Sequence, residues 1–162
     1  MRFFASPAVR CTSIAAAALL ALTACAPSVT MTEAKDANNP ACAPMMVALP
    51  DSLADAKRRT TTAQATAAWG EPSVVVLRCG VTVPGPTTDK CVTVNGVDWV
   101  IKEGDGSWTF TTYGRTPATE LILEENKVPS DTVLTQISAA AAKIPSKGGC
   151  LGLDDVETPK AG

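Results

Sequence analysis

The sequence predicts an α+β fold, in which an antiparallel sheet of about five strands carries an N-terminal and a C-terminal helix on one face. Short β-branched and alternating runs, broken by turn residues, recur between residues 73 and 123. An apolar stripe of helical period follows residue 130. Four cysteines remain once Cys11 in the N-terminal leader and Cys25, the expected lipid attachment site, are set aside, and they are enough for two disulfides.

The strands are expected wherever such a run ends at turn residues. Residues 73–78 contain three consecutive valines, which is typical of a strand buried on both faces. Asn95-Gly96 is the strongest hairpin signal in the chain. Residues 107–113 alternate cleanly, with Trp108 and Phe110 pointing inward. The expected strands cover residues 73–78, 91–94, 97–101, 107–113 and 117–123.

The helices are expected at the two ends of the folded region. Apolar side chains at helical spacing predict a helix over residues 41–49. A further short helical piece is predicted over 51–56, followed by a polar, Thr-rich loop over 57–68. The best helix signal lies after residue 130, with Ser130 or Asp131 as its N-cap. Its apolar stripe comprises Val133, Leu134, Ile137, Ala140, Ala141 and Ile144.

The first 25 residues are typical of an exported bacterial lipoprotein precursor. Arg2 and Arg10 precede an apolar run over residues 14–22, the order of a secretory signal. That run is shorter than the roughly 20 residues a helix needs to span a bilayer. Leu22-Thr23-Ala24-Cys25 then reads as a lipobox, in which the Cys25 thiol takes up a diacylglyceryl group and cleavage makes Cys25 the new N-terminus. The alternative is an ordinary signal peptide cut near Ala24, with Cys25 as a disulfide partner.

These signals divide the chain into four parts. We expect a lipoprotein signal peptide over residues 1–24, a flexible tether over 25–40, a single α+β domain over 41–151 and a disordered tail over 152–162. The predicted location is the extracytoplasmic face of the bacterial cell membrane, where acyl chains on Cys25 hold the protein.

The cysteines are expected to form two disulfides in that oxidising compartment. Four cysteines allow three pairings. We favour Cys79–Cys91, which a hairpin between two strands would bring together, and Cys42–Cys150, which would tie the start of the domain to its end. Zinc is a competing use of four cysteines, but no Cys-x-x-Cys spacing is present, and we predict no metal site.

Composition argues against several functional classes. The chain has no histidine, which removes the usual general base and the commonest metal ligand. Without residues 1–24 it carries 12 basic and 16 acidic side chains, a balance that argues against nucleic acid. Neither Ser-x-x-Lys nor Gly-x-Ser-x-Gly occurs. We therefore expect a protein that is not an enzyme and has no cofactor. The one basic run, residues 57–59, is interpreted as a solvated helix end.

Four short strings occur in order along the chain: Trp69-Gly70-Glu71-Pro72, Arg78-Cys79-Gly80-Val81, Gly96-Val97-Asp98-Trp99 and Thr112-Tyr113-Gly114-Arg115. On these strings, over roughly residues 42–123, the sequence resembles a family of small exported proteins and lipoproteins of actinobacteria that is grouped as a domain of unknown function. The resemblance implies an envelope location and no known activity, and it assigns no catalytic residues.

The residues of these strings also suggest a binding surface. Arg78, Arg115, Trp69 and Tyr113 could line a shallow site for a carboxylate or phosphate, because guanidinium groups bind both bidentately. The simpler interpretation is that Asp98 pairs with an arginine, the tryptophans fill the core and the glycines make turns.

The favoured function is a membrane-tethered binding or interaction module. Its expected partner, besides the membrane at Cys25, is an envelope protein or a cell-wall component. The alternative is a ligand-binding or transport-accessory lipoprotein, which would need an apolar cavity between sheet and helix.

Overall fold

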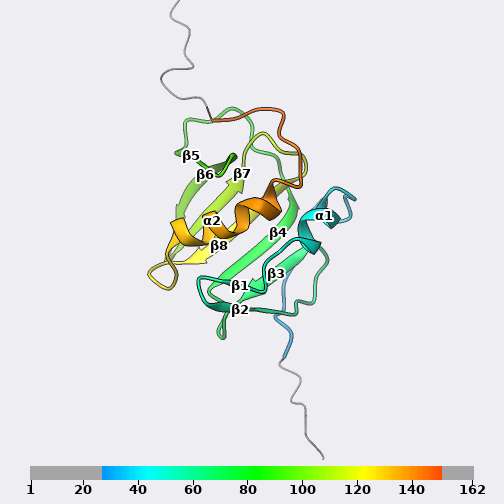
Figure 1. The fold of residues 1–162 in the computed structure, drawn as a ribbon, viewed down its shortest axis with the longest axis vertical. Coiled ribbons are helices and arrows are strands. Elements are labelled where there is room, and N and C mark those ends of the chain that lie inside the picture. The colour runs from blue at the N-terminus through cyan, green and yellow to red at the C-terminus, as the bar shows by residue number, and fades with distance from the viewer. Residues whose placement is uncertain (1–26, 151–162) are drawn as a thin grey trace, which may run out of the picture.

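The computed structural model describes residues 27–150, and its main feature is one antiparallel sheet with helices against one face (Figure 1). The predictions for the leader, for Cys25 and for the tail after residue 151 lie outside the described residues. The helices are α1 (Cys42–Val47) and α2 (Ser130–Ala141). The strands are β1 (Ser52–Leu53), β2 (Ala56–Arg59), β3 (Thr66–Trp69), β4 (Val75–Val81), β5 (Cys91–Val94), β6 (Val97–Gly104), β7 (Ser107–Thr112) and β8 (Ala118–Glu124).

The sheet has eight strands in the order β1-β2-β3-β4-β8-β7-β6-β5, and every neighbouring pair is antiparallel. β4 and β8 are its central pair, although 36 residues separate the end of one from the start of the other in the chain. β5, which follows β4 in sequence, forms the opposite edge. The segment over residues 82–90 therefore crosses three intervening strands.

The predicted fold class is wrong in its strand number and in its helical N-terminus. The sheet has eight strands instead of about five, because residues 52–69, predicted as a helical piece and a loop, form β1, β2 and β3. The first helix is only six residues long. The basic run is part of β2, where Arg58 donates to the Leu49 and Met46 carbonyls at 3.4 and 3.5 Å. The five strands that were predicted all form; residues 91–94 have the predicted ends, and the other four strands are shifted at one end or both.

The core fills the layer between the sheet and its two helices. Alternate residues of β4 and β8, such as Leu77 and Leu121, point into it and are fully buried. Ile137 of α2 meets them from the other side, and α2 crosses the sheet diagonally (Figure 1). Met45 of α1 is fully buried, and its sulfur accepts a hydrogen bond from Thr119 Oγ1 at 3.2 Å. The face of the sheet that the helices cover is therefore filled by packed side chains.

α2 begins without the predicted side-chain cap. Its N-cap residue is Pro129, whose extended backbone leads into the helix, and no side chain caps it. Asp131 lies in the first turn instead, where its charge favours the positive end of the helix dipole. The predicted apolar stripe is confirmed, since Val133, Ile137 and Ala141 are fully buried.

Two disulfides form, as predicted, but the cysteines pair differently from the favoured prediction. The bridges are Cys42–Cys79, which joins α1 to β4, and Cys91–Cys150, which joins β5 to the end of the described chain. The predicted Cys79–Cys91 bridge required β4 and β5 to form a hairpin. They lie four strand positions apart, or roughly 19 Å at 4.8 Å per strand. No pairing of these two cysteines is possible in this sheet.

Candidate functional site

Helices α1 and α2 pack against one face of the sheet, and within residues 27–150 no helix covers the other face, which is therefore its open face. Side chains on a strand alternate between faces, so the neighbours of the core residues point to this open face. The register aligns Arg78, Glu120, Thr111 and Val100 in one row across β4, β8, β7 and β6. The adjacent row includes Thr109 and Lys102 on β7 and β6. Polar side chains from four strands therefore share one surface.

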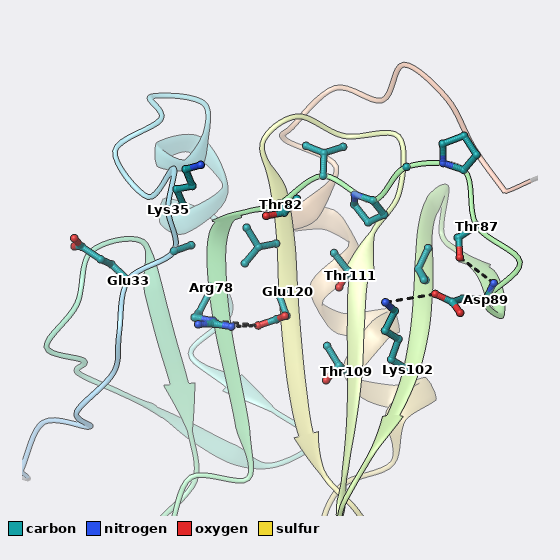
Figure 2. A pocket seen from close by; sticks show the side chains of 17 residues that line it. Glu33, Lys35, Arg78, Thr82, Thr87, Asp89, Lys102, Thr109, Thr111 and Glu120 are labelled. Carbon is teal, nitrogen blue, oxygen red and sulfur yellow. Dashed lines mark hydrogen bonds and ion pairs between the residues drawn. The ribbon is translucent and has the colours of Figure 1, made fainter.

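Two irregular segments turn this surface into a groove of about 620 Å³ (Figure 2). One wall is the N-terminal segment at Glu33–Lys35, which runs beside β4. The other is the crossover over residues 82–89, which passes above the ends of the strands on its way to β5. The floor contains Arg78, Glu120, Thr111, Thr109, Val100 and Lys102.

The groove is lined by equal numbers of positively and negatively charged side chains. Three cations and three carboxylates line it: Lys35, Arg78, Lys102, Glu33, Asp89 and Glu120. Threonine hydroxyls, which both donate and accept hydrogen bonds, lie among them on the floor and the crossover. No aromatic side chain is among the lining residues of the groove. The lining also includes apolar side chains, among them Val81, Val83 and Pro84, so the groove presents charges of both signs beside apolar surface.

An ion pair holds the centre of the floor. Nε and Nη2 of Arg78 donate to Oε1 of Glu120 at 3.1 and 2.6 Å. The Arg78 side chain is 33% exposed and that of Glu120 is 17% exposed, so the pair lies at the groove surface. A second pair, Lys102 with Asp89 at 3.5 Å, links the floor to the crossover (Figure 2).

The structure does not bring the predicted arginine and aromatic residues together. Arg78 lies on the open face, whereas Trp69 is fully buried on the helix-covered face and donates from Nε1 to the Pro50 carbonyl at 3.1 Å. Arg115 is 5% exposed and donates to the carbonyls of Ile144 and Gly96. Of the predicted residues, only Arg78 lines the groove.

The remaining two predicted residues lie near the Cys91–Cys150 bridge. Tyr113 lines a hollow of about 310 Å³ beside that disulfide. Asp98 accepts a hydrogen bond from Thr93 Oγ1, and its backbone carbonyl accepts one from the Tyr113 amide at 2.8 Å. Desolvation by burial lowers the pKa of Arg115, and the nearby charge of Asp98 raises it in part. The expected association of Asp98 with an arginine is therefore electrostatic, with no direct ion pair between them among the described residues.

Arg115 connects the end of α2 to the β5–β6 turn, which gives it a structural role. We expect Arg115→Met to lower the free energy of unfolding by about 2 kcal/mol, because the buried Ile144 carbonyl and the Gly96 carbonyl both lose a charged donor. Lys143→Met is the matched control, since Lys143 is exposed, and it should change stability by less than about 0.5 kcal/mol. Urea unfolding followed by circular dichroism measures both, and equal effects would contradict this role.

Two glycines in the four short strings, Gly80 and Gly114, allow close contact between backbone segments beside the groove and near the Cys91–Cys150 bridge. The sequence analysis did not predict this role. Gly80, at φ +94°, receives the backbone of Asp36, and a Cβ there would lie 2.6 Å from the amide nitrogen of Ala37. Gly114, at φ +69°, packs against Gly148 in the same way. Both were interpreted as turn residues. Their positive φ angles are accessible mainly to glycine. The presence of glycine at these two positions was therefore the one feature of the sequence that could have indicated these contacts.

Over residues 27–150, no group of three or more Cys, Asp or Glu side chains is placed to hold a metal ion. No helix in that range is long and apolar enough to cross a bilayer.

The fold and the groove define a disulfide-linked sheet protein with one packed face and one open, polar face. The chain matches the family described as "Protein of unknown function (DUF3515)" over residues 5–148, and it belongs to that family. Comparison with curated proteins and with solved structures finds no match to the chain.

Proposed function

We propose that this protein is a lipid-anchored, non-enzymatic binding module of the cell envelope, and that the groove on the open sheet face takes an extended polypeptide segment. The single observation that carries the proposal is the groove itself, with its balanced charges and hydroxyl-lined floor. The anchor is the part that rests on sequence alone, through the lipobox at Leu22–Cys25 and the apolar run before it.

The lining chemistry favours a polypeptide over the other envelope polymers. A polypeptide presents one donor and one acceptor per residue, together with side chains of both charges, and the groove offers complements to all of these. A polyanion would meet Glu33, Asp89 and Glu120, which offset the three cations. Sugar rings commonly stack on aromatic faces, and the lining of the groove has none.

The packed face argues against the alternative of a lipoprotein with an apolar cavity between sheet and helix. Val133 and Ile137 of α2 are fully buried against the sheet, as are Trp99 and Leu121. Interiors packed to this degree hold few voids larger than a water molecule. An apolar ligand would have to displace core side chains to enter.

Photo-crosslinking in the native envelope tests the proposal. A photo-reactive amino acid at Thr109, on the groove floor, should give an adduct whose captured partner is identified by mass spectrometry as a peptide and whose mass a glycan hydrolase leaves unchanged. The same amino acid at Val47, which is 87% exposed and does not line the groove, is the matched control and should give little adduct. Equal adducts at both positions, or an adduct at Thr109 whose mass falls on treatment with a glycan hydrolase, would contradict a polypeptide site in the groove.

A further inference from the structure

We infer that the anchor holds the domain directly against the bilayer, with the β2 side of the sheet toward the lipid headgroups and the β5 edge directed away from them. This inference rests on the proposed lipid at Cys25. It concerns the N-terminal segment, for which the sequence predicts a flexible tether over residues 25–40.

Backbone hydrogen bonds attach the beginning of this segment to the loop that follows β2. The Val29 amide donates to the Thr60 carbonyl at 2.9 Å, and the Thr62 amide donates to the Val29 carbonyl at 3.1 Å. The Met31 amide donates to Thr62 Oγ1 at 3.1 Å. Residues 29–31 therefore lie beside this loop.

Further contacts extend the attachment in both directions. Nη2 of Arg59 donates to the Pro27 carbonyl at 2.7 Å, so the first described residue is already held by β2. Toward the other end, the Asp36 amide donates to the Gly80 carbonyl at 3.0 Å, while Ala34 and Ala37 are buried. The segment from Pro27 to Ala37 is part of the domain.

This attachment leaves very little chain between lipid and domain. Pro27 follows Cys25 with a single residue between them, and this stretch of chain spans at most about 7 Å at full extension. A free tether of residues 25–40 would have an r.m.s. length of roughly 22 Å and would let the domain turn in any direction. The short connection places the loop after β2 at the membrane surface.

The strand order then orients the rest of the molecule. β2 lies near one edge of the sheet and β5 forms the other, six strand positions away, or roughly 29 Å at 4.8 Å per strand. Figure 1 shows the blue N-terminal segment and the red-orange C-terminal segment of the described chain at opposite ends of the domain. The crossover wall of the groove, which leads into β5, is therefore the part presented outward, away from the membrane.

Energy transfer to a labelled membrane tests this orientation. The full, processed protein is reconstituted in phosphatidylcholine vesicles that contain a headgroup-labelled acceptor lipid. A donor dye is attached through an unnatural amino acid at Gln64, in the loop after β2, or at Thr88, in the crossover; both positions are exposed. Energy transfer from Gln64 should exceed transfer from Thr88 by at least about threefold, because β2 and β5 lie roughly 29 Å apart.

A linker variant and an anchor variant separate the possible failures. Inserting 15 Gly/Ser residues between Ala26 and Pro27 adds a flexible reach of roughly 21 Å and should bring the two transfer values close together. Flotation of the protein with the vesicles in a density gradient reports anchoring. Equal energy transfer from Gln64 and Thr88 in the unmodified protein, together with flotation that depends on Cys25, would contradict the orientation but not the anchor. Co-flotation unchanged by Cys25→Ala would overturn the anchor, and the orientation with it.

Discussion

Replacing Cys42 and Cys79 together by alanine is expected to lower the free energy of unfolding by about 4 kcal/mol. The bridge closes a loop with a sequence separation of 37, for which the loss of chain entropy in the unfolded state gives a figure of this size. Domains of this length are stable by only about 5–15 kcal/mol, so the loss is large. The thermal midpoint should fall by roughly 12–20 °C in circular dichroism.

The second bridge provides the matched control for this experiment. Cys91–Cys150 has a sequence separation of 59, so chain entropy alone would make its removal slightly more costly. We expect a smaller cost, because it joins the edge strand β5 to the irregular, mostly exposed segment after α2, whereas Cys42–Cys79 joins buried residues of α1 and central β4. An equal or larger effect at Cys91–Cys150 would contradict the central role given to Cys42–Cys79.

The second large effect is expected at Gly80. Gly80→Ala should lower the free energy of unfolding by about 3 kcal/mol, because it combines an unfavourable positive φ with overlap between the new Cβ and the backbone of Asp36 and Ala37. The overlap should also release the N-terminal wall of the groove. Hydrogen exchange measures this directly, since the Asp36 amide loses its bond to the Gly80 carbonyl.

Two other glycines separate the causes. Gly85, in the crossover, has no positive φ, and a Cβ added there would meet nothing within 4 Å, so Gly85→Ala should be close to neutral. Gly96 has φ +74° and open space, so Gly96→Ala should show the conformational cost alone, about 1 kcal/mol. If Gly80→Ala destabilises the protein no more than Gly96→Ala does, the contact with Asp36 does not matter.

The strands could be predicted from the sequence where apolar and polar side chains alternate. They could not be predicted where this alternation is absent. Residues 107–112 alternate, and β7 forms there. β2 contains Lys57-Arg58-Arg59, of which Lys57 is exposed, while Arg58 and Arg59 are half-buried and their guanidinium groups donate to the Leu49 and Gly70 carbonyls. The turn between β1 and β2 is Ala54-Asp55, with φ angles of 44° and 66°. Such a turn usually shows Asn-Gly in the sequence, and here that signal is missing.

The disulfide pairing and the groove depended on long-range order, which local pattern does not contain. The turn residues between Cys79 and Cys91 suggested a hairpin, but the same residues make a crossover, because β8 pairs with β4 instead. The groove floor was within reach of prediction. If Trp108 and Phe110 point inward, Thr109 and Thr111 must point outward, and their hydroxyls mark a polar face. No local sequence pattern indicated that Glu33–Lys35 would form one wall of the groove.

The central claim is that the charges of the groove select its partner, and a charge exchange at the floor tests it most directly. The double variant Arg78→Glu/Glu120→Arg keeps an ion pair across β4 and β8 while reversing its direction, so thermal unfolding should remain within about 1 kcal/mol of the unmodified protein. The yield of the polypeptide adduct at Thr109 should nevertheless fall at least about tenfold, since one misplaced charge-assisted contact costs about 1.4 kcal/mol or more. An unchanged adduct yield in a folded double variant would contradict the groove as the binding site.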